Sequence, residues 1–93
     1  MTDLVIFRTY PEGDTIALFP EMPGNLNPNT CLCYQRTGQH GTADYHGTMK
    51  DTRKSTQAEK QPLIDELESI GYELKEVSRE SIHMFLKRLE HLK

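Results

Sequence analysis

Two short apolar segments near the N-terminus, separated by a turn sequence, do most to limit how this chain can fold. Leu4–Tyr10 (LVIFRTY) and Thr15–Phe19 (TIALF) are rich in β-branched and aromatic residues, which favour extended strands. Between them, Pro11 fixes φ and Gly13 permits a positive φ, as a tight turn requires. We therefore predict an antiparallel β-hairpin, against which the other elements must pack.

The rest of the chain gives two more strand patterns and one clear helix pattern. Cys31–Arg36 alternates in polarity and predicts a third strand, and Tyr72–Val77 predicts a fourth in the same way. Between them, Thr56 and Glu59 have the spacing of a capping box, and Gly71 is a natural C-terminal cap. The helix that they enclose has one apolar face, formed by Leu63, Ile64, Leu67 and Ile70.

The C-terminal half holds one irregularity and a second helix pattern. Pro62 lies past the first turn of the predicted helix, which therefore either kinks there or begins near Lys60. Ser78 can cap a last helix, with Glu80 in its first turn. The apolar residues of this last helix recur on one face, and they are Ile82, Phe85, Leu86, Leu89 and Leu92.

The order β-β-β-α-β-α predicts an α+β fold. We expect a three- to four-stranded antiparallel sheet with one packing helix and an additional C-terminal amphipathic helix. The 93 residues divide into a compact α+β domain at residues 1–77 and the C-terminal helix at residues 78–93.

Charge and composition favour a cytoplasmic protein that binds other proteins. With 11 basic and 14 acidic residues the net charge is −3, which argues against nucleic acid as the main ligand. The sequence shows no secretory leader and no apolar run long enough to cross a membrane. Cys31 and Cys33 lie too far apart on a strand for a relaxed disulfide, which indicates reduced thiols in a reducing compartment.

Reactive side chains gather in and beside a polar segment, Thr37–Lys54, that has no apolar period. A segment of this length in a small domain predicts a functional or disordered loop, with Tyr45–Met49 as a candidate short strand. Glycines flank Gln39 and His40 and would turn this amide and imidazole outward. The alternative is a plain polar turn in which His40 caps a local carbonyl. The expected ligand or partner contacts are Tyr34, Gln39, His40, Asp44 and His46.

Two chemical alternatives use the same segment. Cys31, Cys33, His40 and His46 are ligand types that zinc prefers, but their spacing matches no familiar zinc site. A cysteine with His40 and Asp44 could form the catalytic group of a small hydrolase, although no family-type motif surrounds them. The simpler expectation is that both thiols face the core. We therefore predict no metal and no cofactor.

The stripe on the last helix is too apolar to remain in water. It packs on the sheet, on a second copy of the chain, or on a partner protein, with Phe85 and Leu89 as anchors. The predicted interaction residues of this helix are Ile82, Phe85, Leu86 and Leu89.

The segments 5–8 (VIFR), 17–21 (ALFPE), 38–41 (GQHG) and 66–74 (ELESIGYEL) resemble a group of short uncharacterised proteins from bacteria, phages and mobile elements. The resemblance spans residues 4–77 and groups Cys31, Tyr34, Gln39 and His40, whereas Cys33 and the tail from residue 78 depart from it. It implies a compact accessory domain without an assigned activity.

We therefore predict a small non-enzymatic binding or interaction protein, whose partner is another protein. The alternative functions are a small hydrolase or metal-dependent enzyme that uses residues 31–46, and a structural homodimer.

Overall fold

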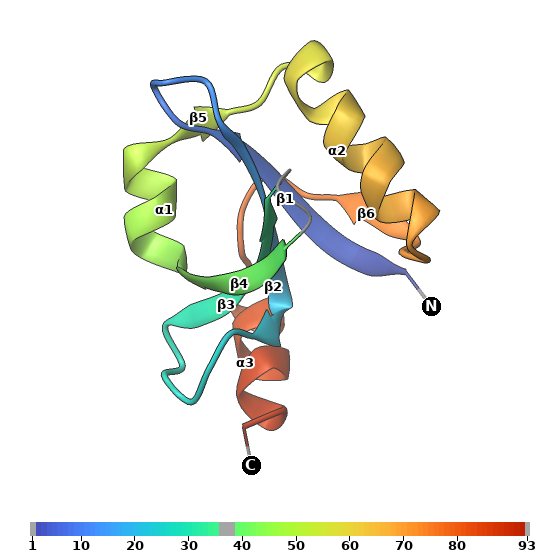
Figure 1. Cartoon of the computed structure of the whole chain (residues 1–93). Coiled ribbons are helices and arrows are strands. Elements are labelled where there is room, and N and C mark those ends of the chain that lie inside the picture. The colour runs from blue at the N-terminus through green and yellow to red at the C-terminus, as the bar shows by residue number, and fades with distance from the viewer. Residues whose placement is uncertain (1, 36–38, 93) are drawn as a thin grey trace.

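The computed structural model describes residues 2–35 and 39–92 and shows an α+β fold (Figure 1). Strands β1 (Asp3–Thr9) and β2 (Thr15–Pro23) form the predicted hairpin, with Ile6 opposite Leu18. Gly13 has a φ of 104° in the turn, a conformation that side chains with a Cβ rarely adopt. The hairpin predicted from the sequence is therefore confirmed.

The sheet is larger than the sequence indicated. Among the described residues six strands pair in the order β4-β3-β2-β1-β5, and β6 also lies beside β1. The predicted antiparallel pairing is confirmed for the main strands, but β6 runs parallel to β1. The chain passes through a helix before it re-enters the sheet at β6, and such a crossover permits a parallel pair. The additional strands are β3 (Thr30–Gln35), β4 (Gln39–Asp44), β5 (Arg53–Lys54) and β6 (Leu74–Glu76).

The described residues contain helices α1 (Tyr45–Asp51), α2 (Gln57–Ser69) and α3 (Ile82–Glu90). The capping box of Thr56 and Glu59 is formed as predicted, and Gly71 ends α2 with a φ of 110°. Pro62 lies inside α2, so the helix does not begin near Lys60. None of these helices combines the length and apolar character needed to span a bilayer.

The prediction that Thr37–Lys54 is a loop is wrong for its described part. Residues 39–54 contain β4, α1 and β5, and the candidate strand at Tyr45–Met49 belongs to α1 instead. An apolar period is missing because β4 exposes nearly all its side chains and α1 buries only Tyr45 and Thr48. Arg36, Thr37 and Gly38 lie outside the described residues.

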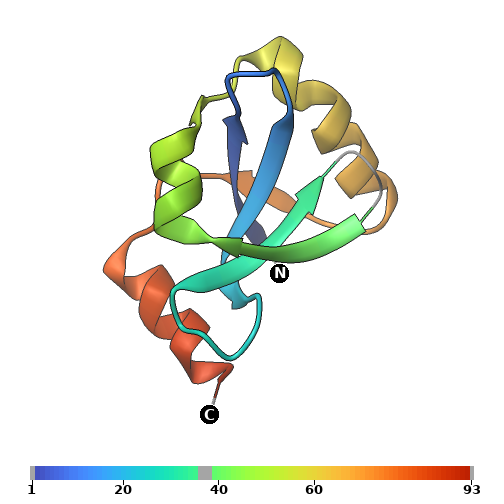
Figure 2. The same cartoon turned by 60° about the vertical axis from the view of Figure 1, so that its left-hand side comes forward.

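Two apolar clusters cover the two faces of the sheet. Helix α2 lies over one face and α1 over the other (Figure 2). Leu63 and Leu67 of α2 belong to the first cluster, and Tyr45 of α1 belongs to the second. Side chains on neighbouring strand positions therefore point into different surroundings. The first face holds Val5, Phe7, Ala17, Phe19 and Tyr34, and the second holds Ile6, Ile16, Leu18, Cys31, Cys33 and Ala43.

Helix α3 is fixed to β2 and to the β2–β3 connection by a buried arginine. Arg88 is fully buried, and its guanidinium donates to the Pro20 carbonyl at 2.8 Å and to the Pro28 carbonyl at 3.0 Å. It also forms an ion pair with Glu80. The helix begins three residues later than predicted, because Ser81 rather than Ser78 accepts the capping hydrogen bond, from the Met84 amide.

Candidate functional site

Strand β4 forms one edge of the sheet and carries three of the predicted contact residues, Gln39, His40 and Asp44. All three side chains are exposed. The predicted exposed turn at Gln39 and His40 is thus an edge strand, paired residue by residue with β3 from Gln35 opposite Gln39 to Thr30 opposite Asp44.

The pairing with β3 determines which backbone groups of β4 face outward. The Tyr45 amide donates to the Asn29 carbonyl at 3.1 Å, and hydrogen-bonded pairs alternate along an antiparallel ladder. The odd-numbered residues of β4 therefore bond to β3. The N–H and C=O groups of His40 and Thr42, and the N–H of Asp44, point away from it. No strand among the described residues pairs with that side of β4.

His40 is held by aromatic side chains on the α2 face of the sheet. Its Nε2 and the Tyr72 hydroxyl share a hydrogen bond of 2.7 Å. Its ring also meets the Tyr34 ring edge-on, with centroids 4.8 Å apart. Tyr72 in turn stacks on the buried ring of Phe19, with centroids 4.9 Å apart. The imidazole is exposed, yet its position is defined by the core beneath it.

The two tyrosines of this cluster serve as hydrogen-bonding groups rather than as bases. The Tyr34 hydroxyl donates to the Glu66 carboxylate at 2.5 Å, and this hydrogen bond raises the pKa of Tyr34. Burial raises the pKa of Tyr72, and the charge of Asp3 adds to the effect. Both phenols therefore stay protonated near neutral pH, so that they can orient polar groups but cannot remove protons.

The predicted contact residues do not form one site. Tyr34 and His40 lie together on the α2 face, whereas Gln39 points to the opposite face because neighbouring strand residues alternate. Asp44 precedes α1, and its carboxylate makes no capping hydrogen bond. His46 lies on α1, where it borders a shallow pocket together with Ile82 and Phe85.

The structure separates the thiols from the histidines. Cys31 and Cys33 are buried on the face opposite His40, as the simpler expectation required. Burial raises the pKa of Cys31 to about 12 and also raises that of Cys33, so neither is an activated nucleophile. Within residues 2–35 and 39–92, no three histidine, cysteine or acidic side chains gather as metal ligands would. The zinc candidates Cys31, Cys33, His40 and His46 are therefore not brought together.

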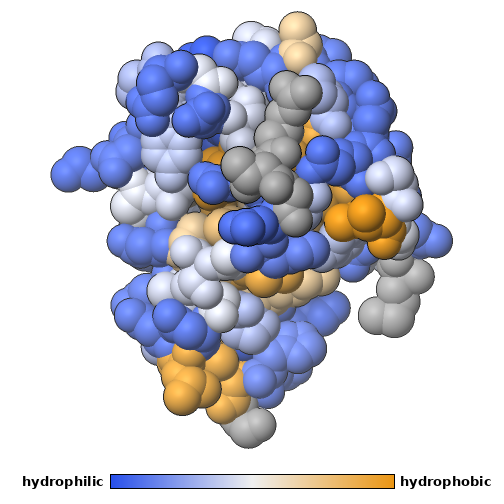
Figure 3. Space-filling model, in the orientation of Figure 1, coloured by the Kyte–Doolittle hydropathy of each residue, from blue (hydrophilic) through white to orange (hydrophobic). Residues whose placement is uncertain are grey.

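Helix α3 leaves part of its apolar stripe exposed. Ile82 is 63% exposed and Leu86 is 50% exposed, whereas the predicted anchors Phe85 and Leu89 are half-buried against the domain. Apolar surface gathers at this end of the molecule in Figure 3, where the β2–β3 connection adds Leu26, which is 86% exposed. Phe85 and Leu89 thus contribute to packing, and Ile82 and Leu86 are the outward residues.

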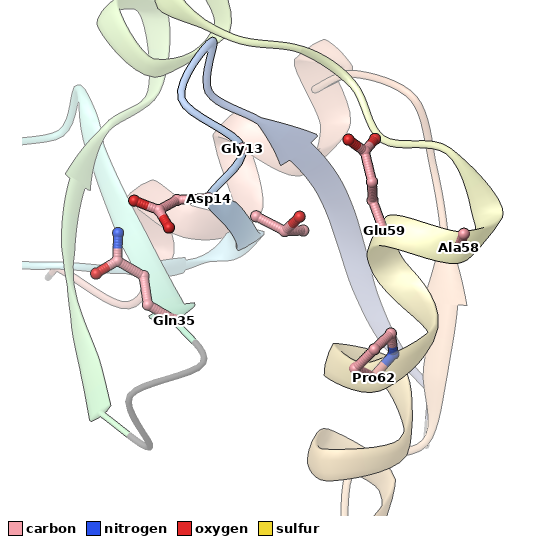
Figure 4. A pocket seen from close by; sticks show the side chains of 7 residues that line it. Gly13, Asp14, Gln35, Ala58, Glu59 and Pro62 are labelled. Carbon is pink, nitrogen blue, oxygen red and sulfur yellow. The ribbon is translucent and has the colours of Figure 1, made fainter.

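Two larger pockets contain none of the predicted residues. In the first, of about 340 Å³, Asp14 and Gln35 face Glu59 and Pro62 across the space between the sheet and α2 (Figure 4). The Glu59 carboxylate is already bound by Arg53 and by the Thr56 amide, so its role is structural. The second, of about 560 Å³, lies between α3 and the ends of β1 and β2.

Sequence reasoning missed the partners of the predicted residues. Tyr72 is the partner of His40, and Glu66 is the partner of Tyr34. Each lies more than 30 residues from the residue that it binds, and no local pattern links them. For Arg88 a signal did exist. It lies three residues after Phe85, on the packed side of the helix rather than the solvent side.

Comparisons with protein families, with curated proteins and with solved structures found no match to this chain. The described residues define only a class, an α+β domain whose edge strand β4 is unpaired on its outer side. Its function has to follow from the geometry of that edge.

Proposed function

We propose that this protein is a small non-enzymatic binding protein that pairs an extended polypeptide segment with strand β4. The observation that carries the proposal is the row of outward backbone groups at His40, Thr42 and Asp44, which no strand of the described chain satisfies. An extended peptide can add a strand to such an edge, where main-chain hydrogen bonds supply affinity and side chains supply selectivity.

The side chains beside this edge suit recognition. His40 and Thr42 are exposed on the α2 face, and the hydrogen bond to Tyr72 limits the freedom of the imidazole. A side chain held in place before binding loses less conformational entropy when the partner arrives. The partly buried hydrogen bond between Tyr34 and Glu66 of α2 supports the same cluster.

The geometry favours binding over the hydrolase alternative. A thiol nucleophile needs a base within hydrogen-bonding reach. Cys31 and Cys33 face the core on one side of the sheet, and His40 lies on the other side with two tyrosines. The free thiols also agree with a reducing, cytoplasmic compartment as part of this proposal. A role as an accessory protein of a phage or mobile element, which the resemblance implies, stays a prediction.

A protein contact through α3 also stays a prediction. Exposed Ile82 and Leu86 support it, but the structure shows nothing that covers them. Leu86→Glu tests the α3 surface independently of the β4 edge, because it changes α3 and leaves β4 unaltered.

The proposed function is tested by selection from a library of random linear peptides. The wild-type protein should enrich peptides that bind along β4, and Thr42→Pro should abolish their binding because it removes an outward N–H. Thr42→Ala is the matched control, since it removes the side chain but keeps the backbone donor. Peptides that bind wild type and Thr42→Pro equally well would place recognition elsewhere and refute the proposal.

A further inference from the structure

We infer that the strand added at β4 is the β4 strand of a second copy of this chain, paired antiparallel about a two-fold axis beside Thr42. This inference rests on the proposed function, for which it names the partner. It is carried by the self-complementary order of backbone groups and of donor and acceptor side chains along β4.

The outward backbone groups permit a symmetric register. With Thr42 of one copy opposite Thr42 of the other, each Thr42 N–H can donate to the facing Thr42 carbonyl. The same register sets Asp44 of each copy opposite His40 of the other, so that the Asp44 N–H can donate to the His40 carbonyl. All three outward positions of both strands are then used.

The side chains agree with this register. His40 and Asp44 lie on the same face of the sheet, because they are four positions apart on one strand. Across the two-fold axis, each imidazole would face the carboxylate of the other copy, so that the ring nitrogen not used for Tyr72 could donate a hydrogen bond to it. On the other face, Gly41 of one copy would lie opposite Ala43 of the other. Neither residue is bulky enough to hinder the pairing.

Both members of this facing pair have a hydrogen-bonding group without a competing partner among the described residues. His40 uses Nε2 for Tyr72, and its other ring nitrogen makes no hydrogen bond there. The exposed Asp44 carboxylate forms neither a capping hydrogen bond nor an ion pair in the described part of the chain.

Other registers fit less well. Sliding one copy by two residues is the smallest shift that keeps outward groups opposite each other. That shift separates His40 from Asp44 and leaves an outward residue at the end of β4 without a facing strand residue. The register centred on Thr42 is therefore favoured over its neighbours.

The interface is small, since it rests on one six-residue strand from each copy. Stable complexes generally bury more than about 1,200 Å². We therefore expect association at micromolar or higher protein concentrations, which permits exchange with other extended segments.

The inference is tested with the full chain by analytical ultracentrifugation from low micromolar to millimolar concentration. Wild type should form dimers, Thr42→Pro should weaken dimerisation at least tenfold, and Thr42→Ala should change it by less than about threefold. Dimers that persist in Thr42→Pro but dissociate in Leu86→Glu would assign the interface to α3 and overturn the inference.

A charge-exchange experiment does not depend on proline. His40→Asp alone and Asp44→Lys alone should each dimerise weakly. The first sets two carboxylates opposite each other in both facing pairs, and the second removes the carboxylate that faces His40 in both. Mixing the two variants should restore association, since the two substituted positions would face each other with opposite charges, and the native His40 would face the native Asp44. Circular dichroism of each variant checks that it remains folded. No gain on mixing would refute the register.

The two proposals fail in different ways. If wild type stays monomeric at millimolar concentration but binds library peptides along β4, the second copy is the wrong partner and the proposed function stands. If it neither dimerises nor selects peptides that depend on the Thr42 N–H, both proposals are wrong.

Discussion

The two sides of the sheet differ in how they end. Short strands cover β1 on one side, and β4 is the outermost strand on the other. Beyond β1 the chain places β5, of two residues, and β6, of three, and both carry charged side chains. Beyond β4 no further strand of the described chain is placed, and β4 itself has six residues paired with β3 without a bulge. Proteins commonly protect edges with short strands, lysine, proline or bulges. β4 has one charged side chain, Asp44 at its end, but no lysine, proline or bulge, which favours its use as a binding surface.

The edge that β5 and β6 cover, called the covered edge below, is also attached to α2 by ion pairs. Arg53 of β5 pairs with Glu59 at 2.6 Å, and Glu76 of β6 pairs with Lys60 at 2.6 Å. The two α2 residues are adjacent, so the start of one helix holds both covering strands. A backbone hydrogen bond from the Val77 amide to the Val5 carbonyl, 2.9 Å long, adds to this attachment.

The largest expected effect concerns the end of the sheet at which β3 begins and β4 ends, where Arg88 attaches α3. Arg88→Ala leaves Glu80 without its cation and two carbonyl groups without their donor. Removing one member of a buried ion pair typically destabilises a protein by about 3–5 kcal/mol. Urea unfolding measures the change in free energy. A loss below about 1 kcal/mol would show that α3 contributes little to the fold.

A double variant distinguishes the cost of leaving one charge unpaired from the cost of losing the packing of Arg88. Arg88→Met with Glu80→Gln removes both charges, and we expect it to be more stable than Arg88→Ala. Hydrogen exchange should also show earlier opening of β3 and β4 than of β1 in Arg88→Ala.

The second prediction places proline at the covered edge. Val5 is fully buried, and β6 pairs with it through Glu76. We expect Val5→Pro to destabilise the protein by on the order of 3 kcal/mol, because proline disturbs the strand and removes core contacts. Chemical unfolding tests this value, with Val5→Ala as the control for packing alone. Equal losses in both variants would mean that backbone pairing at this edge is unimportant.

The third prediction uses pH to loosen the covered edge. The hydrogen bond from Arg53, followed by that from the Thr56 amide, lowers the pKa of Glu59 from 4.5 to about 2. The stabilisation is therefore complete above pH 4.5 and is lost as the pH falls toward 2. Between these values wild type should lose more unfolding free energy than Glu59→Gln, as measured by urea titrations at each pH. Parallel pH profiles for both proteins would contradict this assignment.

The difference between the hairpin and α2 on one hand and β4 on the other explains what the sequence could predict. The hairpin and α2 were predictable because their signals are local: a Pro-Gly turn, a capping box and a glycine cap. β4 was not, because an edge strand exposes most of its side chains and has no apolar alternation. Its candidate residues are indicated by their chemical type and by the glycines that flank Gln39 and His40, not by a strand pattern. The arrangement of His40 with Tyr72 depends on how distant segments pack, which no local pattern encodes.

The smallest expected effect concerns the open edge itself. At a concentration where the protein is monomeric, Thr42→Pro should change the free energy of unfolding by less than about 0.5 kcal/mol, as surface substitutions usually do. The reason is that its N–H points away from β3, so the intramolecular ladder loses no hydrogen bond. Gly41→Pro is the matched control on the same strand, because the N–H at that position faces β3. Dilute urea unfolding should therefore show a clear loss for Gly41→Pro and almost none for Thr42→Pro. Similar losses for both would show that the alternation assigned to β4 is wrong, and with it the distinction between the two edges.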